Sequence, residues 1–119
     1  MFNWGDFISS AGETLPFKIE CDDLTDKDWD TLARIVASRI SYKRAIGVPR
    51  GGLKFAEALN RYRNKDSMLI IICDDVLTTG KSMQKYYEQY SHLPIIGIVV
   101  FARRECSAWI KPIFKYENI

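Results

Sequence analysis

Ile70-Ile-Ile-Cys-Asp74-Asp75-Val-Leu-Thr78-Thr79-Gly80-Lys81-Ser82 is the stretch that decides the fold. It opens on apolar residues, continues with two adjacent carboxylates and closes on a polar segment that contains one glycine. A short apolar run bounded by a turn is typical of a strand buried on both faces. The large residues that follow keep helical spacing: Met83, Tyr86, Tyr87 and Tyr90. The stretch therefore predicts a strand over 68–73, a turn over 74–80 and then a helix.

The same order of strand, turn and helix occurs before this stretch and, in part, after it. Upstream, a helix from Thr25 to about Ile40 precedes a strand over 45–48, a glycine-containing turn and a helix that ends near Tyr62. Downstream come strands over 95–101 and 109–114, and Pro112 places the last one at a sheet edge. This alternation predicts an α/β fold with a Rossmann-like parallel sheet, which binds ligands beyond the carboxyl ends of its strands.

Length and composition set the broad class. The chain has 119 residues, 47% of them hydrophobic and 27% charged, which suits one compact core. We predict a single domain over 1–119, with an irregular lobe over 1–22 and a core over 23–119. No run reaches the roughly 18 consecutive apolar residues of a membrane span, and a secretory signal layout is missing, so we predict a cytoplasmic protein. The three cysteines lack CxxC spacing, which favours neither disulfides nor a zinc site.

The charge is distributed unevenly along the chain. Residues 1–30 carry eight acidic and two basic side chains, net −6, so the remaining residues carry net +8 of the overall +2. A cationic body suits a small anionic ligand, a nucleic acid or an ordinary solvated surface about equally. We do not expect a nucleic acid partner, because the sequence lacks the interleaved aromatic and basic residues of single-strand binders.

The polar part of the central stretch fits a sugar phosphate. Adjacent carboxylates at a strand end, Asp74 and Asp75, can accept hydrogen bonds from a vicinal diol. Thr78, Thr79, Gly80, Lys81 and Ser82 supply hydroxyls and backbone N–H groups at a helix N-terminus, where phosphate binds readily. The plain alternative is that the hydroxyl residues are helix caps and the aspartates are turn residues.

A nucleotide triphosphatase loop is a second alternative, because Gly80-Lys81-Ser82 matches the end of the GxxxxGK[ST] motif. The first glycine of that motif would fall at position 75, which is Asp75. A carboxylate there would repel the phosphate that the loop must wrap. The sequence therefore disfavours this interpretation.

Together with Gly47-Val-Pro49-Arg50-Gly51-Gly52, the stretch resembles the signature of type I phosphoribosyltransferases. The apolar strand, the acidic pair and Thr-Thr-Gly-x-Ser match the family's phosphoribosyl loop, and the glycine turn matches its pyrophosphate loop. A fainter likeness to orotate phosphoribosyltransferases covers the N-terminal segment up to Phe17, as a hood, and Arg104 near a strand end. Ser10 stands where that subfamily has a basic residue, and Arg103 could take the role of Arg104.

The resemblance implies an enzyme that transfers phosphoribosyl between 5-phosphoribosyl 1-diphosphate and a nucleobase. A homodimer is compatible with the sequence, which does not fix the oligomeric state. Asp74 and Asp75 would be catalytic, facing the ribose hydroxyls, and residues 78–82 would hold the 5-phosphate. Pro49, Arg50 and Gly51 would bind the pyrophosphate through a cis Pro49–Arg50 bond, with Mg²⁺ carried by the substrate and no direct protein ligand. Arg104 and Phe17 would contact the base.

One departure from the family favours another class of function. The family inserts a strand pair with a long mobile loop before the acidic pair, whereas Arg63-Asn-Lys-Asp-Ser67 is the whole connection here. A non-catalytic regulatory protein that binds phosphoribosyl diphosphate or a nucleotide is therefore the alternative function.

Overall fold

The computed structural model describes residues 24–77, 79–103 and 106–115. The predicted lobe over 1–22 lies outside the described residues, and so do the candidate site residues Phe17, Thr78 and Arg104. None of the helices in the described part of the chain has the length and apolar character needed to cross a membrane.

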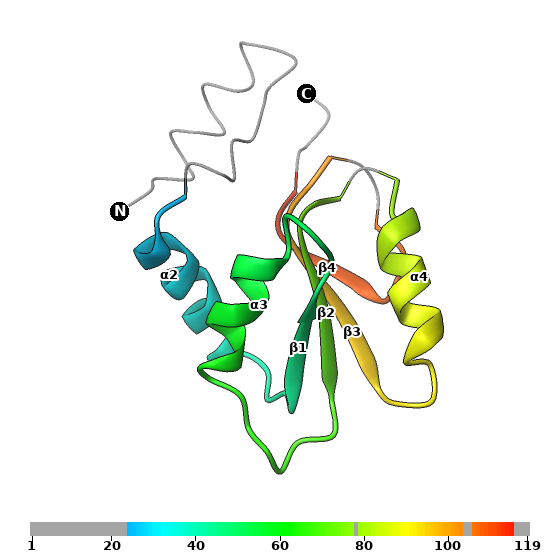
Figure 1. The fold of residues 1–119 in the computed structure, drawn as a ribbon, viewed down its shortest axis with the longest axis horizontal. Helices are drawn as coiled ribbons and strands as arrows, with labels where there is room; N and C mark the ends of the chain where they lie inside the picture. Colours follow the sequence, from blue (N-terminus) through cyan, green and yellow to red (C-terminus); the bar gives the residue numbers. More distant parts are fainter. Residues whose placement is uncertain (1–23, 78, 104–105, 116–119) are drawn as a thin grey trace.

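The core of the molecule is one parallel sheet, shown in Figure 1. Its strands are β1 (Arg44–Gly47), β2 (Ile70–Leu77), β3 (Ile95–Ala102) and β4 (Ile110–Lys115). They stand in sequence order, and each neighbouring pair is parallel. The predicted α/β fold is confirmed. Pro112 does lie in an edge strand, β4, where its missing N–H removes few ladder bonds.

The turn predicted over 74–80 is wrong, because β2 runs on to Leu77. Asp74 aligns with Val99, and Leu77 aligns with Ala102 of β3. Aspartate favours turns when only its neighbours in sequence are considered. Here the adjacent strand β3 continues alongside, and pairing with it outweighs the local preference. The acidic pair therefore belongs to the strand and not to a loop.

Helices cover both faces of the sheet. α2 (Asp26–Ala37) and α3 (Leu53–Asn60) lie on one face, and α4 (Lys81–Gln89) lies on the other (Figure 1). The core on the α2 and α3 side includes Trp29, Leu32, Phe55, Leu59, Ile71 and Val100. The core on the α4 side includes Ile72, Met83, Val99 and Ile110. The strands between the two layers are apolar on both faces, as the continuous apolar runs in the sequence predicted.

Two helices end earlier than predicted. α2 begins as expected, with Thr25 and Asp28 forming a reciprocal capping box, but it ends at Ala37 and not near Ile40. α3 ends at Asn60 and not near Tyr62. In both cases the backbone tightens after the last helical residue: Arg39 N–H bonds Val36 O, and Tyr62 N–H bonds Leu59 O, each three residues back. Such bonds satisfy the last carbonyls of a helix while ending its regular geometry.

The outer edge of β1 is closed by a side chain. The amide of Asn60, the last residue of α3, accepts a hydrogen bond from Ala45 N–H at 2.8 Å and donates to Ala45 O at 2.9 Å. It thus supplies the donor and acceptor that a neighbouring strand would supply. The connection that follows, residues 61–69, contains no strand. β1 is therefore an edge strand, and the N–H and carbonyl of Ala45 on its outer side are bonded within the chain.

We expect Asn60→Ala to lower the free energy of unfolding by about 1–2 kcal/mol, because it leaves two half-buried backbone groups of Ala45 without partners. Asn60→Asp should cost more, since a carboxylate cannot donate to Ala45 O and places a negative charge against it. Urea unfolding followed by circular dichroism measures both. Gln84→Ala, at an exposed helical position, is the control, and equal stability of the Asn60 and Gln84 variants would contradict the role of Asn60.

Candidate functional site

The turn after β1 folds back onto the end of β2. Val48 N–H donates to Cys73 O at 2.8 Å, and Gly52 N–H donates to Val48 O at 2.8 Å. Gly52 is buried, and a Cβ built on it would overlap Cys73 O and lie 2.7 Å from Val48 N. The bond between Pro49 and Arg50 is cis, as predicted. Only a residue without a side chain fits at position 52, which explains the second glycine of the turn.

Gly51 brings the turn into contact with the acidic pair. A Cβ on Gly51 would overlap both carboxylate oxygens and the Cγ of Asp75. The carboxylate therefore lies directly against the backbone of the turn. Pro49 and Arg50, next to this contact, are exposed. Two motifs that are 23 positions apart in sequence, counted from Gly51 to Asp74, thus meet at the carboxyl ends of β1 and β2.

The two carboxylates are held by local hydrogen bonds. Asp75 N–H donates to Asp74 Oδ1 at 2.8 Å, and Val76 N–H donates to Asp75 Oδ1 at 2.7 Å. The pKa of Asp74 is raised to about 7, mainly by burial of its carboxyl and secondly by the neighbouring Asp75. Near neutral pH the carboxyl of Asp74 is thus poised between its neutral and charged forms. A cationic group bound nearby would favour the charged form.

The polar segment after β2 leads into α4 at the same edge of the sheet. Gly80 has φ of 82° and ψ of 0°, a left-handed conformation that glycine adopts without strain, and it is the N-cap of α4. Lys81 N–H donates to Thr79 Oγ1 at 3.3 Å, and Gly80, the N-cap residue, has no side chain that could cap the helix. Thr79, Lys81 and Ser82 are exposed. Backbone N–H groups at the N-terminus of a helix can bind an anion.

The structure therefore brings together part of the predicted site. The turn over 49–51 touches Asp75, and residues 79–82 follow the same strand. Sequence reasoning missed Gly52 and the carbonyl of Cys73, which carry the close packing of the turn. The doubled glycine at 51–52 was the available signal. Cys73 lies buried in the core, which fits a packing role for this cysteine.

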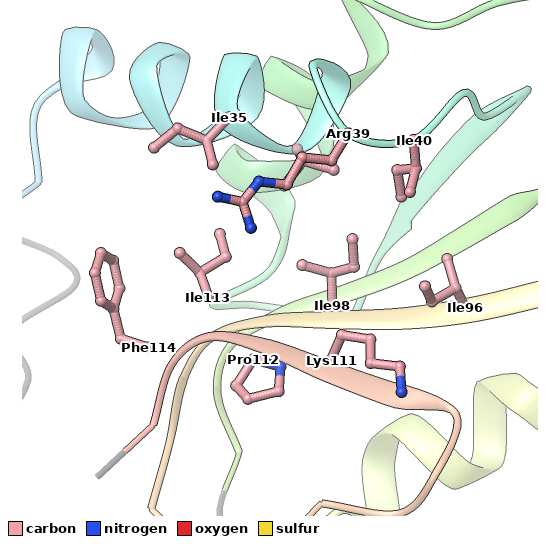
Figure 2. A pocket seen from close by; sticks show the side chains of 10 residues that line it. Ile35, Arg39, Ile40, Ile96, Ile98, Lys111, Pro112, Ile113 and Phe114 are labelled. Carbon is pink, nitrogen blue, oxygen red and sulfur yellow. The ribbon is translucent and has the colours of Figure 1, made fainter.

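A cavity also lies away from these residues. It has a volume of about 400 Å³ and lies between α2 and the strands β3 and β4, as Figure 2 shows. Its walls are mainly isoleucine side chains, and the guanidinium of Arg39 points into it. It opens on one face of the sheet and includes none of the predicted site residues. The acidic pair and the glycine turn are thus not part of this cavity.

No family model and no curated protein sequence matches this chain. Among solved structures, it is similar to the hypoxanthine phosphoribosyltransferase of Trypanosoma cruzi, with 12% identity, 78% of this chain and 77% of that chain covered, and a TM-score of 0.48. A mutant of that enzyme complexed with the product IMP gives 16% identity, 87% and 81% coverage and a TM-score of 0.49. The functional proposal below rests on the residues of this chain.

The raised pKa of Asp74 makes stability depend on pH in a defined direction. The folded state holds the proton up to about pH 7, whereas an unfolded aspartate loses it near pH 3.9. The folded protein thus binds more protons between these values, so the contribution of Asp74 to stability falls as pH rises from about 4 to 7. Asp74→Asn should therefore be more stable than the unmodified protein at pH 8, by about 1–2 kcal/mol once solvent screening is allowed for.

The measurement is urea unfolding of both proteins at several pH values from 4 to 8. The difference between them should widen as the pH rises, while the difference for Gln84→Ala, which removes no titratable group from an exposed position, should stay constant. A difference for Asp74→Asn that does not change with pH would contradict the assigned direction.

Proposed function

We propose that this chain binds 5-phosphoribosyl 1-diphosphate at the carboxyl ends of β1 and β2, and transfers the phosphoribosyl group to or from a nucleobase. The observation that carries the proposal is the contact between Gly51 and the carboxylate of Asp75. This contact joins the glycine turn, which would bind the diphosphate, to the acidic pair, which would bind the ribose diol. Both are needed at one place by a single ligand. The N-terminus of α4, at Gly80 and Lys81, follows β2 at the same end of the sheet.

Each part of the site has a proposed role in this reaction. Asp74 and Asp75 accept hydrogen bonds from the ribose hydroxyls and stabilise the positive charge that develops on the sugar as its bond to diphosphate breaks. Residues 78–82 hold the 5-phosphate through N–H and hydroxyl groups. Arg50 and Gly51 hold the diphosphate. The proposed base contacts, Phe17 and Arg104, lie outside the described residues.

Mg²⁺ belongs to the proposal as part of the substrate. Within the described residues, no cluster of three or more His, Cys, Asp or Glu side chains is arranged to hold a metal ion. Asp75 is a hard oxygen donor beside the diphosphate turn, and it fits contact with water bound to such an ion. Bound with the diphosphate, Mg²⁺ would neutralise charge on the leaving group.

A second candidate function is regulatory binding without turnover, and one observation favours it. The connection between α3 and β2 spans only residues 61–69 and crosses the amino end of the sheet, away from the site. Asn60 occupies the outer edge of β1, where an additional strand would pair. Neither segment can close over the ligand, and closure normally excludes water from such a reaction.

We expect the protein to bind 5-phosphoribosyl 1-diphosphate with Mg²⁺, and Asp75→Asn combined with Thr79→Ala to weaken binding at least about tenfold. Hydrogen bonds to charged groups contribute roughly 1.5–3 kcal/mol each. Isothermal titration calorimetry measures the dissociation constant. Asp26→Asn combined with Thr31→Ala, on α2, makes the same chemical changes away from the site and should leave binding unchanged. Equal affinity of the two double variants would remove the site assignment.

A second measurement distinguishes an enzyme that transfers the phosphoribosyl group from a protein that only binds the ligand. We expect slow transfer to orotate, uracil and purine bases from the isolated protein, well below the median enzyme turnover of about 10 s⁻¹. The reason is that no described segment shields the site from water. An assay with radiolabelled bases, repeated over a series of protein concentrations, measures the rate of transfer. A rate that rises with concentration indicates that a second copy covers the site. Fast turnover independent of concentration would refute the regulatory alternative.

A further inference from the structure

A smaller pocket lies at the amino ends of the strands, at the edge of the sheet opposite to the proposed site. It has a volume of about 240 Å³ and is lined by Lys43, Arg44, Arg63, Met68, Ile70 and Leu93. These residues come from the start of β1, the connection over 61–69, the start of β2 and the connection before β3. Figure 1 shows this edge at the lower end of the strands. The pocket shares no residue with the proposed phosphoribosyl site.

Three of the six lining residues are cations, and none of them forms an ion pair within the part of the chain that the structure describes. Lys43, Arg44 and Arg63 are exposed. Among the described residues, the ion pairs are those of Arg34 and Arg61 with Asp30 and Glu57. Cations after a helix can complement its dipole, but this effect fades within the last turn, and Lys43 and Arg44 lie at the start of a strand. Helix stabilisation therefore does not account for the cluster.

Backbone and side-chain hydrogen bonds hold the cations together. Asn64 N–H donates to Tyr42 O at 2.7 Å, and Lys43 N–H donates to Leu69 O at 2.7 Å. Asn64 Nδ2 donates to Ser41 Oγ at 3.0 Å. These bonds fasten the residues before β1 to the residues before β2. The positive charges of Lys43, Arg44 and Arg63 are thus brought near one another before any ligand arrives, which lowers the entropy lost on binding.

The other half of the pocket is apolar. Met68 is 68% exposed, an unusual degree for a large hydrophobic side chain. Ile70 is aligned with Arg44 across the β1 and β2 ladder, so their side chains project from the same face of the sheet. Leu93 completes the apolar wall. A ligand that neutralises the cations can therefore also cover apolar surface.

We propose that this pocket binds a small phosphate monoester that carries an apolar group about the size of a phenyl ring. Two arginines and a lysine suit a phosphate dianion, which arginine binds with paired hydrogen bonds. The apolar residues suit the esterified group. The volume lies below the roughly 300–1,000 Å³ of pockets for drug-sized ligands, which favours a small molecule over a nucleic acid strand.

The test is a titration of the full-length ¹⁵N-labelled protein with phenyl phosphate, followed through backbone amide resonances. Saturable shifts are expected at Arg44, Ile70 and Leu93, with weaker binding of inorganic phosphate. The affinity for phenyl phosphate should fall at least about tenfold in a triple variant that loses the charged hydrogen bonds of the pocket, Lys43→Gln, Arg44→Gln and Arg63→Gln. The control is a triple variant that removes the same charge from other exposed positions, Lys27→Gln, Lys54→Gln and Lys85→Gln. Its affinity for phenyl phosphate should be unchanged. Met68→Ser should reduce the preference for phenyl phosphate over inorganic phosphate.

Three results would overturn the inference. Equal loss of affinity in the two triple variants would mean that net charge, and not the pocket, attracts the ligand. Shifts confined to residues 79–82 would assign phosphate binding to the other edge of the sheet and leave the proposed function standing. Tighter binding of a single-stranded oligonucleotide at the same three cations would identify a nucleic acid surface. If the triple variant loses its native circular dichroism, Arg44→Gln alone is used, with Lys54→Gln as its control.

Discussion

The close approach of the glycine turn to the end of β2 is the contact on which the rest of the proposed site depends. Gly52 packs against the carbonyl of Cys73, and Gly51 packs against the carboxylate of Asp75. A side chain at either position would displace the turn. Because the turn is fixed to the strand in this way, its exposed residues, Pro49 and Arg50, are held beside the acidic pair. The two motifs form one surface only while this contact persists.

The same edge contains a group that opposes folding at neutral pH. Burial and the neighbouring Asp75 raise the pKa of Asp74, so ionising its carboxyl costs free energy in the folded protein. A ligand with hydroxyl donors or a developing positive charge would offset part of that cost. Strained or poorly solvated groups gather at functional sites because interactions with the ligand compensate for them. The electrostatics of Asp74 therefore agree with a site that is complete only when a ligand is bound.

The opposite edge of the sheet has the reverse character. Several backbone groups here are bonded within the chain: Asn60 pairs with the N–H and carbonyl of Ala45, and Lys43 N–H donates to Leu69 O. Its charges, Lys43, Arg44 and Arg63, are not satisfied by carboxylates among the described residues. A parallel sheet makes this separation natural, because all strand beginnings lie at one end and all strand ends at the other. Two anion-binding regions can thus exist on one small sheet without sharing residues.

The sequence by itself determined the order of the elements, the parallel α/β fold and the segments that form the proposed site. Hydrophobic runs and helical spacing are local, and strands such as 95–101 needed no further information. Only the tertiary structure decided that β2 continues through Asp74 and Asp75, since that depends on pairing with β3. It also decided that Gly51 meets Asp75 and that Asn60 closes β1. Contacts between residues far apart in sequence leave no periodic pattern along the chain, so a single sequence predicts the segments but not their meeting points.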